Sequence, residues 1–111
     1  ETYLLDGFDV FVGPEALIHR GLEAGAVGAV SALASAFPED VAAVVRSPTE
    51  EGAQRLAELR AAVERYPRVA AFKRVAARRG VPIRADVRAP LRDLDGGEVE
   101  AFDAWLADVV R

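Results

Sequence analysis

The chain contains few side chains that could act as a nucleophile, a base or a metal ligand. Lys73 is its only lysine and His19 its only histidine, and there is no cysteine. A lysine that forms an imine needs a pKa lowered by burial or by nearby cations, and the only such neighbours in the sequence are Arg74 and Arg78. Because Lys73 follows Phe72 in a predicted helix, away from any strand end, we interpret it as structural.

The other polar candidates also have structural explanations. His19 lies in a predicted helix and has no acidic or histidine partner at the spacing of metal ligands, so no metal site is predicted. Ser31 and Ser35 lack the Gly-x-Ser-x-Gly frame of a nucleophilic serine, although Ser31 could donate a hydrogen bond in support of a site. Glu39 and Asp40 begin a predicted helix, where they would offset the helix dipole rather than act as acid and base.

Composition excludes several classes of protein. Half of the residues (51%) are hydrophobic and the net charge is -4. The absence of cysteine rules out a disulfide scaffold, a thiolate metal site and a cysteine nucleophile. No apolar run approaches the roughly 20 residues that span a bilayer, and no signal peptide is visible. We therefore expect a soluble, cytoplasmic protein with no membrane partner, and the negative charge argues against a nucleic-acid partner.

The first part of the chain predicts a strand–helix–strand unit. We expect strands over residues 8–12 and 26–32 and a helix over residues 14–24. Both strands are apolar on both faces, which favours a parallel sheet covered by helices. The connection of about a dozen residues suits a right-handed crossover and is too long for a hairpin. Pro14 is expected at the first helical position and Gly25 just after the last turn.

This unit also locates the candidate site. In parallel α/β units, function lies just beyond the C-terminal ends of the strands. Those ends are Gly13-Pro14-Glu15 and Val30-Ser31-Ala32. Glu15 is expected to face the positive end of the helix dipole. Gly25 and Gly28 precede and interrupt a strand, so they do not form a phosphate-binding loop, and we expect them to permit close helix–strand packing.

The rest of the chain predicts helices. A helix begins at Pro38, and a capping box from Ser47 to Glu50 opens a second one that Pro67 interrupts. Arginines and glutamates, Arg60 among them, are expected on the solvent face of this second helix. The remaining predictions are a loop over residues 1–7, a helix over 68–79 with Val69, Phe72, Val75 and Ala76 inward, an extended connector over 81–94, and a final helix capped by Asp95.

The strand–helix–strand unit does not look self-sufficient. Two parallel strands cannot close a sheet and would leave apolar edges in water. The chain opens at Glu1, which is not an initiator methionine, close to the first predicted strand. We therefore expect the C-terminal part of a larger domain, and we expect this stretch to aggregate when it is expressed alone.

The order of elements and the residues at their joints resemble the dihydrodipicolinate synthase / N-acetylneuraminate lyase family. The resemblance covers nearly all of this chain and about the last third of a family member. It implies the C-terminal part of a (β/α)8 TIM barrel, with residues 1–46 as the last two βα units and residues 47–111 as a C-terminal helical extension. The matching segments are VFVG (10–13), GLEAGAVGAVS (21–31), FPE (37–39), FK (72–73), GVP (80–82) and RAPL (88–91).

The same resemblance implies an activity. Members of this family are aldolase-type lyases or synthases that act on pyruvate-like 2-keto acids through a Schiff base on a lysine, without a cofactor, and often as dimers or tetramers. That lysine lies upstream of the matched segments, so no catalytic residue is expected in this chain. Gly13 and Val30 match residues that line the substrate, while Pro14, Glu15 and Ser31 match positions that vary with the substrate or support the site.

A second reading concerns the basic stretch from Arg68 to Arg92. It is rich in arginine and nearly free of acidic residues, so it could belong to a non-enzymatic binding or regulatory module that contacts an acidic partner. Because it lacks interleaved aromatic residues and a recognised nucleic-acid-binding module, a solvated helix face or a subunit contact is favoured.

Overall fold

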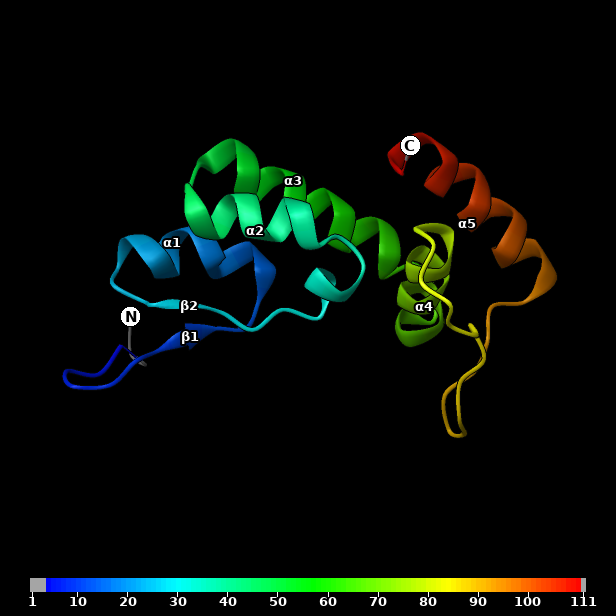
Figure 1. Cartoon of the computed structure of the whole chain (residues 1–111), viewed down its shortest axis with the longest axis horizontal. Helices are drawn as coiled ribbons and strands as arrows, with labels where there is room; N and C mark the ends of the chain where they lie inside the picture. Colours follow the sequence, from blue (N-terminus) through cyan, green and yellow to red (C-terminus); the bar gives the residue numbers. More distant parts are fainter. Residues whose placement is uncertain (1–3, 111) are drawn as a thin grey trace. The chain divides into compact units, whose positions relative to one another are not determined.

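The computed structural model of the chain describes residues 4–110. The backbone forms two compact units, Glu1–Ala61 and Ala62–Arg111. The predicted loop over residues 1–7 is described from residue 4 onward, and its first three residues lie outside the described part. Figure 1 shows the elements, which are β1 (Phe11–Val12), a 3-10 turn η1 (Glu15–Leu17), α1 (Ile18–Glu23), β2 (Gly28–Ala29), a 3-10 turn η2 (Leu33–Ser35), α2 (Pro38–Arg46), α3 (Glu50–Val63), α4 (Arg68–Arg78) and α5 (Gly96–Val109).

The two strands pair in parallel, as the crossover length predicted. Phe11 is in register with Gly28, and Val12 with Ala29. Each strand is much shorter than expected, because the predicted strands over 8–12 and 26–32 reduce to two residues apiece. At the start of the first one, the Phe8 N–H donates to the Leu5 carbonyl at 3.3 Å and closes a turn. The pairing extends slightly beyond the two-residue strands, because the Val27 N–H donates to the Val10 carbonyl and the Val30 N–H to the Val12 carbonyl, both at 2.9 Å.

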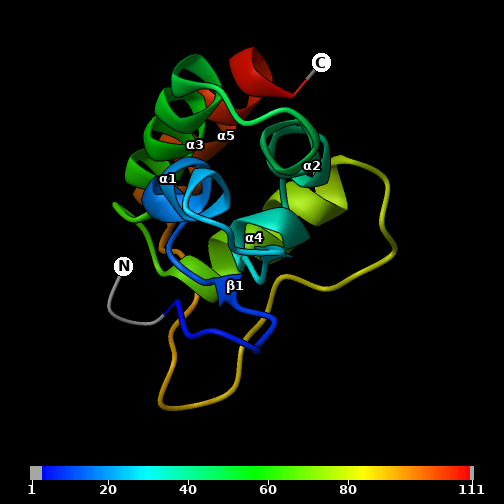
Figure 2. The same ribbon diagram turned by 90° about the vertical axis from the view of Figure 1, so that its left-hand side faces the viewer.

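Helix α1 lies directly against β1, and Figure 2 shows the helix over the strand. Gly21 makes this approach possible, because a Cβ at that position would overlap Val12 Cγ2. Gly25 ends the helix as predicted, whereas the packing role also expected of it is wrong, because no atom would lie within 4 Å of an added Cβ. Its φ of +108° is left-handed, and the Gly25 and Ala26 N–H groups cap the helix by donating to the carbonyls of Leu22 and Gly21. Gly28 packs against the paired strand rather than against the helix, since an added Cβ would lie 3.0 Å from the Phe11 ring.

The start of the crossover differs from its prediction. Pro14 has a ψ of 124° and precedes the first helical residue instead of occupying it. The segment then begins with the 3-10 turn η1, and regular α-helix starts at Ile18. The proline therefore directs the chain out of the strand, and Glu15 takes the first helical position.

Helices α2 and α3 complete the first unit. Pro38 lies in the first turn of α2, as predicted. The capping box predicted at Ser47 is wrong by two residues, because Thr49 Oγ1 accepts the Gly52 N–H at 3.0 Å and α3 begins at Glu50. Ser47 instead ends α2, with its N–H donating to the Ala43 carbonyl at 2.9 Å. Helix α3 ends at Val63, before the expected limit at residue 66.

The second unit contains α4 and α5, which bury a small apolar core. Pro67 separates α4 from α3, as predicted, and Gly80 ends α4 with a φ of +90°. Val69 was expected to face inward but is 38% exposed. The residues of α4 that are buried are Ala70, Ala71, Phe72 and Val75, and those of α5 are Phe102 and Leu106.

The capping box predicted at Asp95 is confirmed. The Glu98 N–H donates to Asp95 Oδ1 at 2.9 Å, and the Asp95 N–H donates to Glu98 Oε2 at 3.0 Å. Arg92, at the end of the irregular connector, donates to both oxygens of Glu98 at 2.7 and 2.8 Å. One carboxylate therefore caps α5 and fastens the connector to it.

Acidification should loosen this end of α5. The bonds from Arg92, and then the Asp95 N–H, lower the pKa of Glu98 from 4.5 to about 2. A carboxyl whose pKa is lower in the folded state stabilises the protein above its unfolded pKa, and this contribution disappears as the pH falls through the folded pKa. The protection factors of the Glu98 and Val99 amides, which are corrected for the pH dependence of intrinsic exchange, should therefore fall between about pH 4.5 and pH 2.

The variants Glu98→Gln and Glu100→Gln separate this effect from general acid unfolding. The first removes the titrating group, whereas Glu100 is an exposed residue of the same helix. We expect Glu98→Gln to have low protection factors that change little with pH, and Glu100→Gln to behave as the parent chain. An unchanged acid response in Glu98→Gln would assign the loosening to another group.

Candidate functional site

The C-terminal ends of β1 and β2 lie at the same edge of the strand pair. The Val30 N–H donates to the Val12 carbonyl at 2.9 Å, which places Val30 beside the start of the Gly13 turn. The Val30 side chain is 72% exposed, and a Cβ at Gly13 would meet no atom within 4 Å. Gly13 and Val30 therefore form an open ledge at this edge, and Pro14, also exposed, leads away from it.

A buried carboxylate joins the two loops behind this ledge. Glu15 is 5% exposed. Its Oε1 accepts hydrogen bonds from Ser31 Oγ at 2.7 Å and from the Leu33 N–H at 3.1 Å. Ser31 Oγ in turn accepts the Ala34 N–H at 3.2 Å. Glu15 was expected to face the end of its own helix, but it caps the turn η2 that follows the other strand.

Helix α3 provides a charge partner for this carboxylate. Arg60 Nη1 lies 3.1 Å from Glu15 Oε2, and the two side chains are 22% and 6% exposed. Burial alone raises the pKa of Glu15, but the hydrogen bonds from Ser31 and from the backbone, together with the Arg60 charge, more than offset it and lower the pKa below its ordinary value. Glu15 is therefore ionised at neutral pH.

Arg60 was expected on the solvent face of its helix, and this prediction was wrong. Leu56 and Val63 are both fully buried, and Arg60 lies four residues after the first and three before the second. Positions at this spacing share one face of a helix. The sequence did contain a signal for this pair, because an arginine on the same helix face as buried apolar residues is expected to have an acidic partner.

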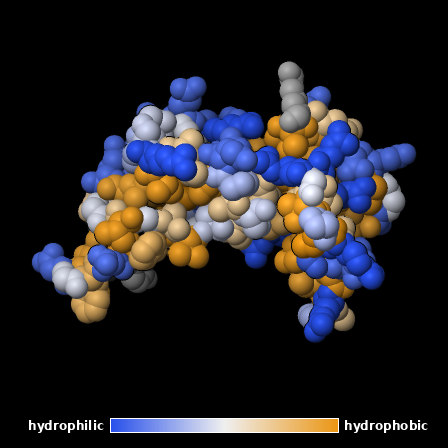
Figure 3. All heavy atoms as spheres, in the orientation of Figure 1, coloured by the Kyte–Doolittle hydropathy of each residue, from blue (hydrophilic) through white to orange (hydrophobic). Residues whose placement is uncertain are grey.

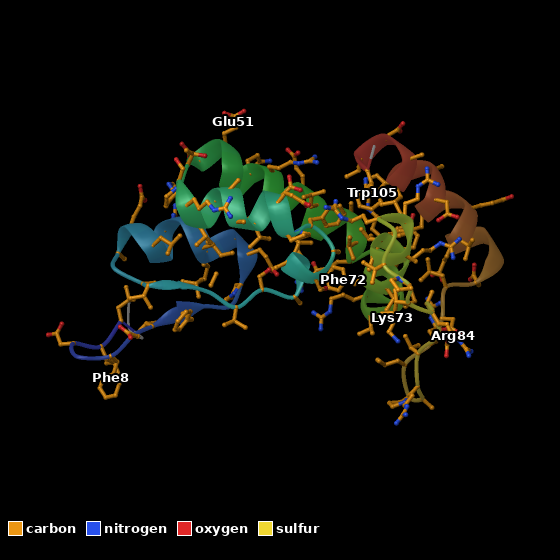
Figure 4. All side chains as sticks on the ribbon, viewed as in Figure 1. Phe8, Glu51, Phe72, Lys73, Arg84 and Trp105 are labelled. Carbon is orange, nitrogen blue, oxygen red and sulfur yellow. The ribbon has the colours of Figure 1, made fainter. Side chains whose placement is uncertain are left out.

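The two residues with the most reactive side chains lie elsewhere and have structural contacts. Lys73 Nζ donates to the Asp86 carbonyl at 2.8 Å, which ties α4 to the connector (Figure 4). His19 Nε2 lies 3.3 Å from Glu23 Oε1, one turn along α1, so the prediction that it has no acidic partner was wrong. Within residues 4–110, no group of three or more His, Cys, Asp or Glu side chains is arranged to hold a metal ion.

Large apolar side chains are exposed around the strand pair. Phe8, Phe11, Val27 and Val30 are 71%, 56%, 54% and 72% exposed. Phe8 points away from the rest of the chain in Figure 4, and apolar atoms gather beside the strands in Figure 3. Contiguous exposed apolar surface of this kind marks a place where other protein packs or a ligand binds.

The basic stretch is partly neutralised by pairing within its own unit. Arg74 donates to both carboxylate oxygens of Asp103 at 2.6 Å, and Arg84 lies 2.8 Å from Asp86. Arg92 is paired with Glu98, as described above. A cavity of about 340 Å³ in this unit is lined by Arg74, Ala77, Arg78, Ile83, Ala85, Asp103 and Leu106. Arg74, which lines this cavity, is already paired with Asp103. The three ion pairs therefore favour a structural role for the basic stretch over a role in binding a partner.

No helix within residues 4–110 is long and apolar enough to cross a membrane.

Comparison with known proteins agrees with the resemblance seen in the sequence. The model of the dihydrodipicolinate synthetase family matches residues 2–108. Two curated relatives from Halobacterium salinarum, strains R1 and NRC-1, are each named an uncharacterized DapA-like lyase. Each is 35% identical over 104 residues, which cover 87% of this chain and 34% of the relative. The chain therefore spans about a third of the length of the curated relatives it matches.

Proposed function

This chain belongs to the dihydrodipicolinate synthetase family, and we propose that it is the C-terminal part of a Schiff-base-forming lyase or synthase acting on pyruvate or a related 2-keto acid. The family match and the lyase names of the two relatives support the reaction class. The observation that carries the proposal is the ledge of Gly13 and Val30 at the C-terminal edge of two parallel strands. In barrel enzymes this edge holds the substrate.

The proposed architecture is the end of a (β/α)8 barrel. Residues 1–46 would provide its last two βα units and residues 47–111 a helical extension. The exposed Phe11 and Val27 support this, because strand side chains of such a barrel pack in its filled interior or beneath its ring of helices. The remaining strands would come from the part of the protein that corresponds to the other two thirds of the relatives.

The proposed chemistry needs no cofactor. The amine of a lysine outside this segment attacks the keto carbon, a proton is taken up, water leaves, and a protonated imine remains. This imine accepts the electron pair of the C–C bond one carbon removed from it and becomes an enamine when that bond breaks, and the enamine returns the pair when the bond forms. Val30 would provide apolar contact to the bound keto acid, and Gly13 would let the substrate approach the backbone closely.

The proposed assembly is a dimer or tetramer in the cytoplasm, in contact with the upstream part of its own barrel. Exposed apolar side chains in the second unit support a subunit contact. Val69, Val81, Ile83 and Leu91 are 38%, 49%, 41% and 53% exposed.

Trimming Val30 tests the proposed substrate contact. In the full-length protein, Val30→Ala should raise the pyruvate concentration needed for half-maximal borohydride trapping by about tenfold. Loss of two methyl groups from an apolar contact costs about 0.8 kcal/mol each, and 1.4 kcal/mol corresponds to tenfold.

Val27→Ala is the matched control for this experiment. Val27 is also an exposed valine, but it precedes β2 and lies at the opposite end of the strand from the ledge. Its half-maximal concentration should stay near that of the parent protein. Equal shifts in the two variants would count against Val30 as a substrate contact.

A further inference from the structure

We propose that Arg60 and Glu15 are positioning residues, through which helix α3 holds the two strand-end loops that carry Gly13 and Val30. The catalytic consequence of this pair rests on the function proposed above, whereas the tie between helix and loops does not. It gives the helical part of the chain a direct role in the geometry of the site.

The hydrogen bonds of the Glu15 carboxylate show that it links the two loops. Both oxygens of Glu15 are engaged by the chain itself, Oε1 by Ser31 and Leu33 and Oε2 by Arg60. Ser31 directly follows Val30, and Glu15 lies two residues after Gly13. A single group therefore fixes the separation between the two halves of the ledge. We assign Glu15 to positioning rather than to substrate contact.

The burial of the Glu15–Arg60 pair strengthens this link. Glu15 has a 6% exposed side chain, so its interaction with Arg60 is shielded from solvent and salt. Charge-assisted hydrogen bonds to a carboxylate are also shorter and stronger than neutral ones. Loss of Arg60 would leave the carboxylate buried without its cation, and the loops would move to let water reach it.

A neighbouring ion pair provides the matched control. Arg55 is also on α3, and its Nε lies 3.3 Å from Asp40 Oδ1 on α2. The Arg55 side chain is 46% exposed, and its partner Asp40 belongs to α2 and not to either loop of the ledge. Both arginines therefore lie on α3 and pair with a carboxylate. Arg60 pairs with Glu15 in a strand-end loop, whereas Arg55 pairs with Asp40 in another helix.

The test uses the full-length protein with Arg60→Met, Arg60→Lys and Arg55→Met. Two quantities are measured: the rate of borohydride-trapped imine formation at saturating pyruvate, and amide hydrogen exchange over residues 30–36. Misplacement of reacting groups by about 1 Å costs on the order of 100-fold in rate. We expect Arg60→Met to lose about 100-fold in rate, Arg60→Lys to recover at least half of that loss on a logarithmic scale, and Arg55→Met to match the parent protein.

Exchange separates failure of this inference from failure of the proposed function. If the parent protein forms no imine, the proposed function fails, and faster exchange at Leu33 and Ala34 in Arg60→Met alone still upholds the tie. The inference is overturned if Arg60→Met equals Arg55→Met both in amide exchange and in the rate of imine formation. If Arg60→Met does not fold, the double variant Glu15→Gln/Arg60→Met, which removes both charges, replaces it. Amide exchange in this double variant that equals that of the parent protein also overturns the inference.

Discussion

Replacing Phe102 with alanine is expected to lower the free energy of unfolding by about 3–5 kcal/mol, the cost of emptying a buried aromatic site. Phe102 is fully buried in α5. Its ring centroid lies 5.0 Å from that of Tyr66 in an edge-on contact and 5.3 Å from that of Trp105. The substitution removes both ring contacts as well as the apolar burial.

Trp105 reports on this site directly, because its ring contacts that of Phe102. Urea unfolding followed by its fluorescence should show a lower midpoint in Phe102→Ala. Glu100→Ala provides the control, since Glu100 is an exposed residue of the same helix and surface substitutions usually change stability by less than about 0.5 kcal/mol. Similar losses in the two variants would show that Phe102 does not anchor the core of this unit.

Replacing Gly21 with valine is expected to cost about 3 kcal/mol, near the upper end for an overpacked contact. A Cβ at Gly21 would overlap Val12 Cγ2, and the branched Val12 side chain has few rotamers with which to move aside. The helix would have to lift from β1, which would separate the crossover from the strand that leads to the ledge.

A second substitution on the strand isolates the clash. Val12→Ala removes the methyl groups that Gly21 accommodates, so Val12→Ala/Gly21→Val should recover a large part of the lost stability, measured by urea unfolding. Arg20→Val is the control for valine in this helix, because Arg20 is exposed. If the double variant is as unstable as the sum of the two single ones, the contact between α1 and β1 does not explain the effect.

The features that the sequence predicted well are local. The capping box of Asp95 and Glu98, the proline in the first turn of α2, and the left-handed Gly25 after α1 each depend on residues within one turn of one another. Where two such signals overlap, the prediction failed. Ser47 and Thr49 both precede the same helix, and only the geometry decides that Thr49 caps it.

The features that the sequence missed depend on contacts between distant residues. The length of each strand depends on its neighbours, so apolar composition over residues 8–12 overstated β1. In the candidate site, too, one part could be predicted from the sequence and another part could not. The shared edge of Gly13 and Val30 follows from the parallel topology, but Glu15 finds its partners 18 and 45 residues away, at Leu33 and Arg60. Local pattern alone does not specify such pairs.

The most direct measurement is peptide mapping after the full-length protein is reduced with borohydride in the presence of pyruvate. The expected result is a stable adduct on one lysine in a peptide outside these 111 residues, with Lys73 unmodified because it is engaged with the Asp86 carbonyl. An adduct on Lys73, or the absence of any adduct, would contradict the assignment of this chain to a Schiff-base lyase.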